Sequence, residues 1–328
     1  MNVAFFIRHF TERGTEVSIY DYAKYNEEIL QNKSYIICFT EETQRKNKLP
    51  EERYSFDKFK QLFQIIEIED IKDMRNVIQN YDLSFFYTQT HGGGNDIYQF
   101  ENKNIWGNCK TIKHCVFDTT YPESDFYVSI SATLNQKYRT TLPVIPYIVD
   151  LPYHNENLRN ELQIPRDAIV YGRYGGFHEF NISYVHKSIE TYINMDDKCF
   201  FLFMNTEAFY KHPRIIYIPR NLDLDYKTKF INTCDVMIHA RCIGETFGLS
   251  IAEFSLMNKP IITCKCGDLE HIEILGDKAI QYNSYAELMN IFTNIQSLIV
   301  SRTNWNAYIK FTPEYVMNLF RTYIFEKP

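Results

Sequence analysis

The chain has 328 residues, which exceeds one ordinary domain and suits two, because domains usually hold roughly 100–200 residues. Hydrophobic residues make up 45% and charged residues 23%, and these globular values exclude wholesale disorder. The formal net charge of −6 argues against a nucleic-acid-binding role. The aromatic bias, 25 Tyr and 25 Phe against 2 Trp, resembles that of AT-rich coding genomes such as those of giant viruses or low-GC microbes.

The sequence predicts neither a secretory leader nor a membrane-spanning helix. Met1–Ile7 runs straight into Arg8 and a predicted strand. The longest uncharged stretch, Leu288–Ser301, is shorter than the roughly 18–20 apolar residues that span a bilayer. The eight cysteines include no C-x-x-C pair, which is typical of reduced cytosolic thiols and indicates no disulfide framework or zinc site. We therefore expect a cytoplasmic protein, with peripheral membrane association left open.

Short β-type runs alternate with amphipathic stretches through the first part of the chain. The predicted strands are Val3–Phe10, Ser34–Phe39, Gln64–Ile68, Leu83–Gln89, His114–Phe117 and Phe126–Ser131. The predicted helices are Thr15–Asn32, Phe56–Phe63 and Ile71–Asn80. The charged stretch Glu41–Lys60 is expected to be a solvated loop leading into a helix.

The alternation restarts after the segment Leu142–Pro152, whose three prolines exclude a continuous helix. The strands predicted there are Ala168–Tyr171, Cys199–Met204, Ile215–Ile218, Val236–Ala240 and Pro260–Cys264. The predicted helices are Asn181–Tyr192, Lys227–Asn232, Phe247–Met257, Tyr285–Thr293 and Pro313–Phe325. We predict an α/β fold of two doubly wound parallel-sheet domains that face each other across a cleft. The domains are residues 1–145, completed by the terminal helix at 313–328, and residues 146–312.

The most informative segment runs from Asp235 to Glu253. A strand ends near Ala240, a glycine-containing loop follows, and a helix is expected to begin near Phe247 with Thr246 as its N-cap. The first amides of a helix lack intrahelical acceptors and attract anions, so a diphosphate can dock there. The expected contacts in this turn are Thr246, Phe247, Gly248 and Leu249.

Two carboxylates flank this turn. Glu253, about 9 Å along the predicted helix, would accept hydrogen bonds from ribose hydroxyls. Glu245 would face the group beyond the phosphates. The alternative is that Glu253 is a solvated helix residue and Glu245 a first-turn acid favoured by the helix dipole.

Glu245 and Glu253 stand as E-x7-E within GETFGLSIAEFSLMNKPIIT, which resembles the signature of retaining GT-B glycosyltransferases, especially family 4. Flanking segments match as well: Val144–Asp150 as the interdomain linker, Val170–Arg173 as a strand end, Pro260–Thr263 as the next strand and Gly267–Glu270 as the turn after it. The match is strong over residues 142–275 and mainly architectural over 1–140. The resemblance implies that the second domain binds a UDP- or GDP-sugar donor. It further implies that the sugar passes, with retention, to a hydroxyl of a glycan, lipid-linked or small-molecule acceptor.

By the same resemblance, Glu245 contacts the donor sugar, Glu253 contacts the ribose and Arg173 contacts the diphosphate. A surface ion pair is the alternative for Arg173. The family usually places a lysine five or six residues later, where this chain has His178 and Glu179. Arg241, a protonated His178 or Lys187 could replace it.

In the first domain, Gly14 and Thr15 follow the first strand, where these enzymes carry a glycine loop near the donor phosphates; a plain strand–helix turn is the alternative. His91 precedes three glycines and resembles the histidine held near the anomeric carbon, although a structural hydrogen bond would also explain it.

Other chemistries find less support. The chain contains no G-x-G-x-x-G, P-loop or G-x-S-x-G motif and no D-x-D metal clamp. We therefore expect metal-independent transfer without a cofactor, in which helix amides and arginine stabilise the leaving charge. A nucleotide-sugar epimerase of the same fold and a degenerate nucleotide-sugar-binding module are the alternatives.

Overall fold

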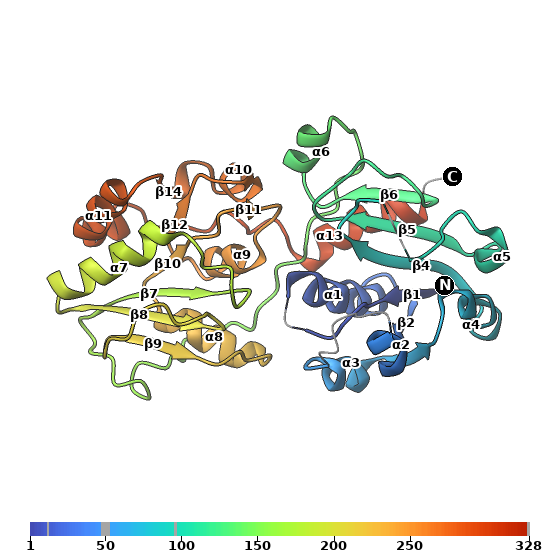
Figure 1. The fold of residues 1–328 in the computed structure, drawn as a ribbon, viewed down its shortest axis with the longest axis horizontal. Helices are drawn as coiled ribbons and strands as arrows, with labels where there is room; N and C mark the ends of the chain where they lie inside the picture. The colour runs from blue at the N-terminus through green and yellow to red at the C-terminus, as the bar shows by residue number, and fades with distance from the viewer. Residues whose placement is uncertain (12, 47–52, 95–96, 327–328) are drawn as a thin grey trace. The chain divides into compact units, whose positions relative to one another are not determined.

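The computed structural model describes residues 1–11, 13–46, 53–94 and 97–326. Backbone contacts divide the chain into two units, Met1–Ile148 with Phe311–Pro328, and Val149–Lys310. Each unit is built on a six-stranded sheet with helices on both faces (Figure 1). The division at 148/149 lies three residues beyond the boundary at 145/146 expected from the sequence.

The sheet of the first unit has the strand order β3-β2-β1-β4-β5-β6, and all of its pairings are parallel. Its strands are β1 (Asn2–Phe6), β2 (Lys33–Phe39), β3 (Gln64–Ile68), β4 (Leu83–Thr90), β5 (Lys110–Cys115) and β6 (Phe126–Ser129). Its helices are α1 (Gly14–Glu28), α2 (Glu41–Lys46), α3 (Phe56–Leu62), α4 (Met74–Tyr81, after a 3-10 turn at Ile71–Asp73), α5 (Lys103–Trp106) and α6 (Ala132–Tyr138).

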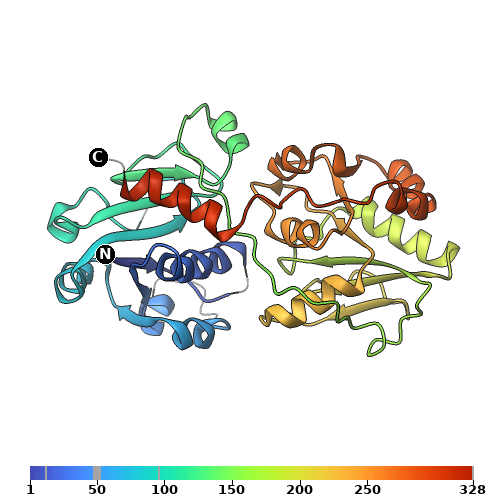
Figure 2. The ribbon, with the colours of Figure 1, turned by 180° about the vertical axis from the view of Figure 1, so that it is seen from behind.

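The end of the chain also belongs to this unit. Helix α13 (Pro313–Phe320) has proline in its first turn and the Thr312 side chain as its N-cap, and it continues into a π-helical turn, Arg321–Phe325. The rings of Tyr22 on α1 and Phe320 on α13 lie 5.5 Å apart. Figure 2 shows α13 beside α1 on one face of the sheet.

Three helices of the first unit, α2, α5 and α6, were not expected. A loop leading into a helix was expected over Glu41–Lys60, but Glu41–Lys46 forms α2. Its acids lie in the first turn and its bases in the last, an order that suits the helix dipole but that also looks like a solvated loop. Residues 47–52 lie outside the described part of the chain. Helix α6, capped by the Ser131 hydroxyl, was also missed.

The sheet of the second unit has the order β14-β12-β10-β7-β8-β9 and is likewise parallel. Its strands are β7 (Ile169–Tyr174), β8 (Cys199–Met204), β9 (Ile215–Ile218), β10 (Val236–His239), β12 (Ile261–Cys264) and β14 (Ala279–Tyr282). A separate two-residue pair joins β11 (Gly244–Glu245) to β13 (Asp268–Leu269). The helices are α7 (Ser183–Met195), α8 (Leu224–Thr233), α9 (Leu249–Leu256), α10 (Glu270–Leu275), α11 (Tyr285–Thr293) and α12 (Ile295–Val300), with a 3-10 turn at Gly276–Lys278.

The turn after β4 depends on one glycine. The amides of Phe117 and Asp118 donate to the carbonyl of His91, which brings the two chain segments together. Gly92, the residue after His91, has φ +104°, and a Cβ there would lie 1.7 Å from the Asp118 carbonyl oxygen. Any side chain at this position would therefore force the segments apart.

We expect Gly92→Ala to lower the free energy of unfolding of the first unit by about 1–3 kcal/mol or more, because it adds backbone strain and a steric clash. Gly93→Ala is the matched control, since its Cβ would make only ordinary contacts at 3.6 and 3.7 Å. Urea unfolding followed by Trp106 fluorescence in a Trp305→Phe chain reports on this unit. Equal stability of the two variants would contradict the requirement for glycine at position 92.

Candidate functional site

The polar residues of interest follow strands at which the sheets reverse their winding direction. In the second unit the chain builds β7, β8 and β9 to one side and then returns to place β10 on the other side of β7. The carboxyl ends of β7 and β10 therefore form the topological switch point of the sheet, the usual ligand position in such folds. Arg173 and Arg241 lie at these two strand ends. In the first unit, the corresponding strands are β1 and β4.

The loop after β10 is fixed by a close backbone approach. Gly244 and Glu245 form β11 and pair with Asp268 and Leu269. A Cβ at Gly244 would lie 2.1 Å from the Asp268 carbonyl oxygen, so only glycine permits this pairing. The pairing places Glu245 beside the end of β10.

Both carboxylate oxygens of Glu245 have nitrogen partners. The Nε2 atom of His239 lies 3.2 Å from Oε1, and an NH1 group of Arg241 donates to Oε2 at 2.9 Å. Burial raises the pKa of Glu245, but the His239 hydrogen bond and the Arg241 charge outweigh it and bring the pKa to about 2. Glu245 therefore carries its negative charge throughout the physiological pH range.

His239 belongs to a longer hydrogen-bonded chain. Its Nδ1 atom lies 2.9 Å from the hydroxyl of Thr263, its direct partner on the neighbouring strand β12. The same hydroxyl lies 3.0 Å from Nε2 of His271 on α10. His271 is fully buried, and this burial lowers its pKa to about 3, so the ring is neutral. Sequence reasoning missed Thr263 and His271, because only folding brings them to the Glu245 loop.

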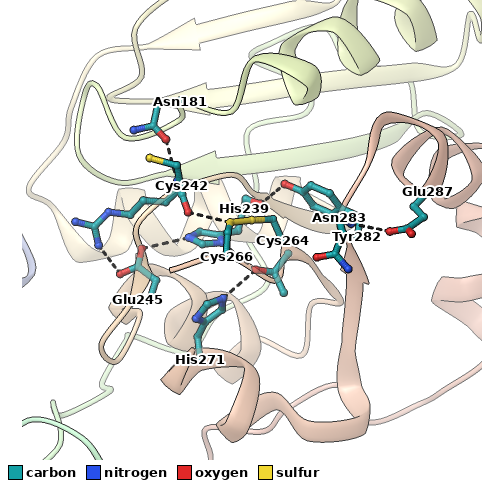
Figure 3. Close-up of a disulfide and its surroundings, with 12 residues drawn as sticks. Asn181, His239, Cys242, Glu245, Cys264, Cys266, His271, Tyr282, Asn283 and Glu287 are labelled. Atoms are coloured by element: carbon teal, nitrogen blue, oxygen red, sulfur yellow. Dashed lines mark hydrogen bonds and ion pairs between the residues drawn. A yellow bond between two sulfur atoms is a disulfide. The ribbon is translucent and has the colours of Figure 1, made fainter. Parts of the chain in front are cut away.

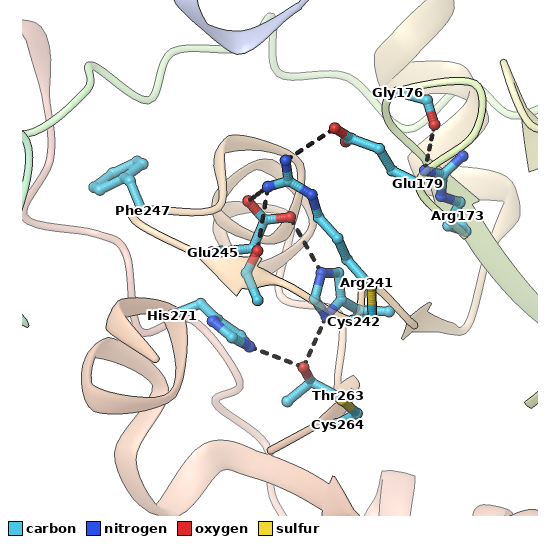
Figure 4. Close-up of polar contacts among 12 residues, drawn as sticks. Arg173, Gly176, Glu179, Arg241, Cys242, Glu245, Phe247, Thr263, Cys264 and His271 are labelled. Carbon is cyan, nitrogen blue, oxygen red and sulfur yellow. Dashed lines mark hydrogen bonds and ion pairs between the residues drawn. The ribbon is translucent and has the colours of Figure 1, made fainter. Parts of the chain in front are cut away.

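Arg241 connects the loops after β7 and β10. Besides Glu245, its guanidinium donates to Glu179 at 2.9 Å and to the Gly244 carbonyl at 3.2 Å. Figure 4 shows the Arg241 side chain between the two glutamates. Glu179, proposed from the sequence only as a departure from the family pattern, is thus part of the site.

The guanidinium of Arg173 is buried behind this cluster. It donates to the Gly176 carbonyl at 2.8 Å, to the Asn205 carbonyl at 3.1 Å and to the Thr206 hydroxyl. Burial lowers its pKa to about 10, so it remains charged. These bonds tie the ends of β7 and β8 together, and a phosphate contact by Arg173 stays a prediction.

The helix of the signature begins later than expected. Helix α9 starts at Leu249, and its N-cap is Gly248 with φ +82° and no side-chain cap, so the expected start near Phe247 with Thr246 as N-cap is wrong. The reason is that the Phe247 ring packs against Tyr308, whose hydroxyl donates to the Phe247 carbonyl at 2.9 Å. The Phe247 ring points away from the Glu245 cluster (Figure 4).

Thr246 and Phe247 are accordingly buried, whereas Leu249 is half-exposed at the first turn of α9. Any contribution of Thr246 and Phe247 to ligand binding would come from the backbone. In α9 the amides of Leu249, Ser250 and Ile251 precede the first helical hydrogen bond, which runs from the Ala252 amide to the Gly248 carbonyl.

Glu253 lies in the second turn of α9 and is 3% exposed, which excludes the reading as a solvated helix residue. Its Oε1 atom lies 2.8 Å from Nζ of Lys227 on α8. That ammonium group also lies 5.4 Å from the centre of the Tyr174 ring at the end of β7. Lys227 and Glu253 are far apart in sequence and on different helices, so no spacing signal could have revealed the pair.

The candidate residues of the first unit follow β1 and β4. Gly14 opens α1, and the Thr15 hydroxyl donates to Glu16 at 2.8 Å, which in turn lies 2.8 Å from His9. His91 directly follows β4 and is exposed, with its ring against Phe117. Their proposed contacts with a ligand stay predictions.

One disulfide differs from the expectation of reduced thiols. Cys264 at the end of β12 is bonded to Cys266, two residues further along (Figure 3). Reduced cysteines were expected because most lie in or beside apolar runs, and no disulfide framework was expected because no C-x-x-C pair occurs.

None of the helices in the described residues combines the length and apolar character needed to cross a bilayer. Within the same residues, no group of three or more His, Cys, Asp or Glu side chains is placed to hold a metal ion.

Comparisons with known proteins give structural matches only. No protein-family model and no curated protein sequence matches the chain. The Anabaena protein HepE in complex with UDP-glucose aligns with a TM-score of 0.72 at 14% identity, covering 99% of both chains. A glycosyltransferase from Rickettsia africae aligns with a TM-score of 0.68 at 15% identity, covering 97% of this chain and 94% of its own. A putative UDP-N-acetylglucosamine 2-epimerase from Listeria monocytogenes aligns with a TM-score of 0.62 at 11% identity, covering 100% of this chain and 97% of its own.

At these identities the likeness establishes the fold. The predicted α/β class of two Rossmann-like, doubly wound domains is confirmed, and it is the GT-B fold of these structural neighbours.

The buried neutral His271 predicts a pH dependence of stability. Its pKa is about 3 in the folded protein against 6.5 ordinarily, so between these values the unfolded chain binds one more proton and stability falls as the pH falls. From about pH 6.5 to 5 we expect His271→Asn to remove up to one proton, about 1.4 kcal/mol per pH unit, from this slope. Glu245 adds about a quarter of a proton to the slope at pH 5 and less above it, since its ordinary pKa is 4.5 and its folded value is lower still; this addition is the same in the wild type and in His271→Asn.

Urea unfolding followed by Trp305 fluorescence in a Trp106→Phe chain measures this slope for the second unit. His178→Asn is the control, because the His178 side chain is 75% exposed. Parallel slopes in the wild type and His271→Asn would show that His271 is not held neutral.

Proposed function

We propose that the protein is a glycosyltransferase that moves a sugar from a nucleotide-sugar donor to an acceptor hydroxyl. The observation that carries the proposal is an ionised carboxylate, Glu245, held between Arg241 and His239 at the carboxyl end of β10. It lies four residues ahead of the uncapped start of α9. The GT-B fold and the E-x7-E spacing support the same conclusion.

The donor would lie along the first turns of α9. Its diphosphate would accept hydrogen bonds from the amides that begin at Leu249, where the helix dipole favours negative charge. Arg241 is the proposed second cation. Glu253 is about 6 Å of helix rise beyond Leu249 and would accept from the ribose hydroxyls beside Lys227. We favour UDP over GDP because HepE was crystallised with UDP-glucose.

Glu245 would bind the transferred sugar. Each carboxylate oxygen can accept about two hydrogen bonds, so the contacts with His239 and Arg241 leave capacity for sugar hydroxyls. We propose that Gly14, Thr15 and His91 of the first unit contribute to the donor phosphates and the anomeric carbon, as the family resemblance implies.

We further propose that transfer proceeds with retention and without a metal ion. The acceptor oxygen bonds to the anomeric carbon on the face that the diphosphate leaves, while the bond between that carbon and the phosphate oxygen breaks. The acceptor proton passes to the departing phosphate oxygen. Arg241 and the α9 amides stabilise the charge that develops on the diphosphate.

A nucleotide-sugar epimerase is the second candidate, because the putative Listeria epimerase covers the whole chain. It would eliminate UDP and add it back without any acceptor. Incubation with UDP-sugars, followed by NMR of the products with and without a glycan or lipid-linked acceptor, separates the two activities. Acceptor-dependent UDP release with an α-linked product and insensitivity to EDTA support the proposal. An epimerised donor without transfer supports the epimerase, and binding without any turnover indicates a degenerate module.

The two glutamates should give different kinetic defects. Glu253→Gln is expected to raise the donor KM about tenfold or more, because a charge-assisted ribose hydrogen bond is worth roughly 1.5–3 kcal/mol. Glu245→Gln is expected to lower kcat about 10²-fold with a smaller effect on UDP affinity, because UDP lacks the transferred sugar. Glu190→Gln on α7 is the surface control. Wild-type kinetics in both site variants would remove the proposed site.

A further inference from the structure

We propose that Thr263 and His271 are positioning residues for Glu245, acting through His239. The inference rests on the proposed function and deepens it. Thr263 on β12 and His271 on α10 would orient the carboxylate that binds the transferred sugar. Neither residue touches the donor in this account.

His239, Thr263 and His271 are joined by two consecutive hydrogen bonds. His239 and Thr263 are direct partners on the central strands β10 and β12, so their side chains emerge at the same level of the sheet. The Thr263 hydroxyl lies 2.9 Å from one imidazole and 3.0 Å from the other. All three residues are at most 5% exposed, so water competes little for these bonds.

His239 is held between Glu245 and Thr263. Ionised Glu245 can only accept, so Nε2 of His239 donates to it. The Nδ1 atom on the opposite side of the ring is hydrogen-bonded to the Thr263 hydroxyl, which is shared with Nε2 of His271. Thr263 thus holds the ring in the orientation that delivers an N–H group to Glu245.

His271 also lies beside the start of α9. A Cβ placed on Gly248, the N-cap of α9, would lie 3.3 Å from Cβ of His271. His271 therefore packs against the cap of the diphosphate-binding helix while it holds the chain that ends at Glu245. Figure 4 shows His271 on α10 directed toward Thr263, below Glu245.

Two substitutions at Thr263 separate the role of its hydroxyl from that of its packing. Valine fills nearly the same space as threonine but offers no hydroxyl, so both imidazoles lose their shared partner. Serine keeps the hydroxyl and loses only a methyl group. A chemical role and a packing role therefore predict opposite orders of effect for these two variants.

The test compares Thr263→Val with Thr263→Ser in the full-length chain. We expect Thr263→Val to lower kcat of sugar transfer about tenfold or more, and Thr263→Ser to stay within about threefold of wild type. Calorimetry with UDP should give a Kd within about twofold for both, because UDP does not reach Glu245. Wild-type kcat in Thr263→Val, equal losses in both variants, or a parallel loss of UDP affinity would overturn the inference.

A second readout does not depend on turnover. The 15N shifts of the His239 ring in the ligand-free protein, assigned with His239→Gln, should show protonated Nε2 in the wild type and in Thr263→Ser. Thr263→Val should shift the Nδ1 resonance, because this nitrogen loses its hydrogen-bond partner. Unchanged shifts would overturn the positioning role even if the protein transferred no sugar, whereas failure of the proposed function would show as an inactive wild type in which Thr263→Val still shifts the Nδ1 resonance.

Should Thr263→Val not fold, His271→Phe replaces it, since the phenyl ring is of similar size but has no nitrogen to bond to the Thr263 hydroxyl. The same loss of kcat at constant UDP affinity is expected, and wild-type kcat would overturn the inference.

Discussion

The site depends on the cost of burying a carboxylate. A buried negative charge must be paired and hydrogen-bonded, or it takes up a proton. Glu245 meets this requirement with Arg241 on one oxygen and His239 on the other. The Gly244–Asp268 backbone approach holds the loop in place, and Glu179 steadies Arg241 from the loop after β7. The ends of β7, β10 and β12 are thus joined through one charged group.

The two acidic residues of the signature differ in how they are neutralised. Glu245 shares its charge with an arginine and a histidine at the strand ends, whereas Glu253 pairs with Lys227 between two helices. Arginine binds a carboxylate through a planar group of defined geometry, whereas lysine provides a compact ammonium group. The more directional partner of Glu245 fits its proposed role in orienting a donor sugar.

Much of the fold follows from local patterns, and less of the site does. Four elements were predicted with the bounds that the structure has: Gln64–Ile68, Cys199–Met204, Ile215–Ile218 and Tyr285–Thr293. Each is an apolar or amphipathic run between turn residues, so the sequence pattern defines both of its ends. The start of α9 was placed too early, because Phe247 prefers the core beside Tyr308 to a helical position. Lys227, Thr263 and His271 were missed because each meets its partner through sheet order and helix packing, which the spacing of residues does not encode. The charged segment Glu41–Lys46 looked like a loop because its sequence lacks an apolar stripe.

The central claim is that the first amides of α9 bind a diphosphate between Glu245 and Glu253. A crystal structure of the protein with UDP tests it most directly. The account predicts phosphate oxygens at hydrogen-bond distance, about 2.7–3.2 Å, from backbone nitrogens at Leu249–Ile251, with the ribose beside Glu253. A nucleotide bound away from α9, or one whose ribose lies nearer Glu245 than Glu253, would contradict it.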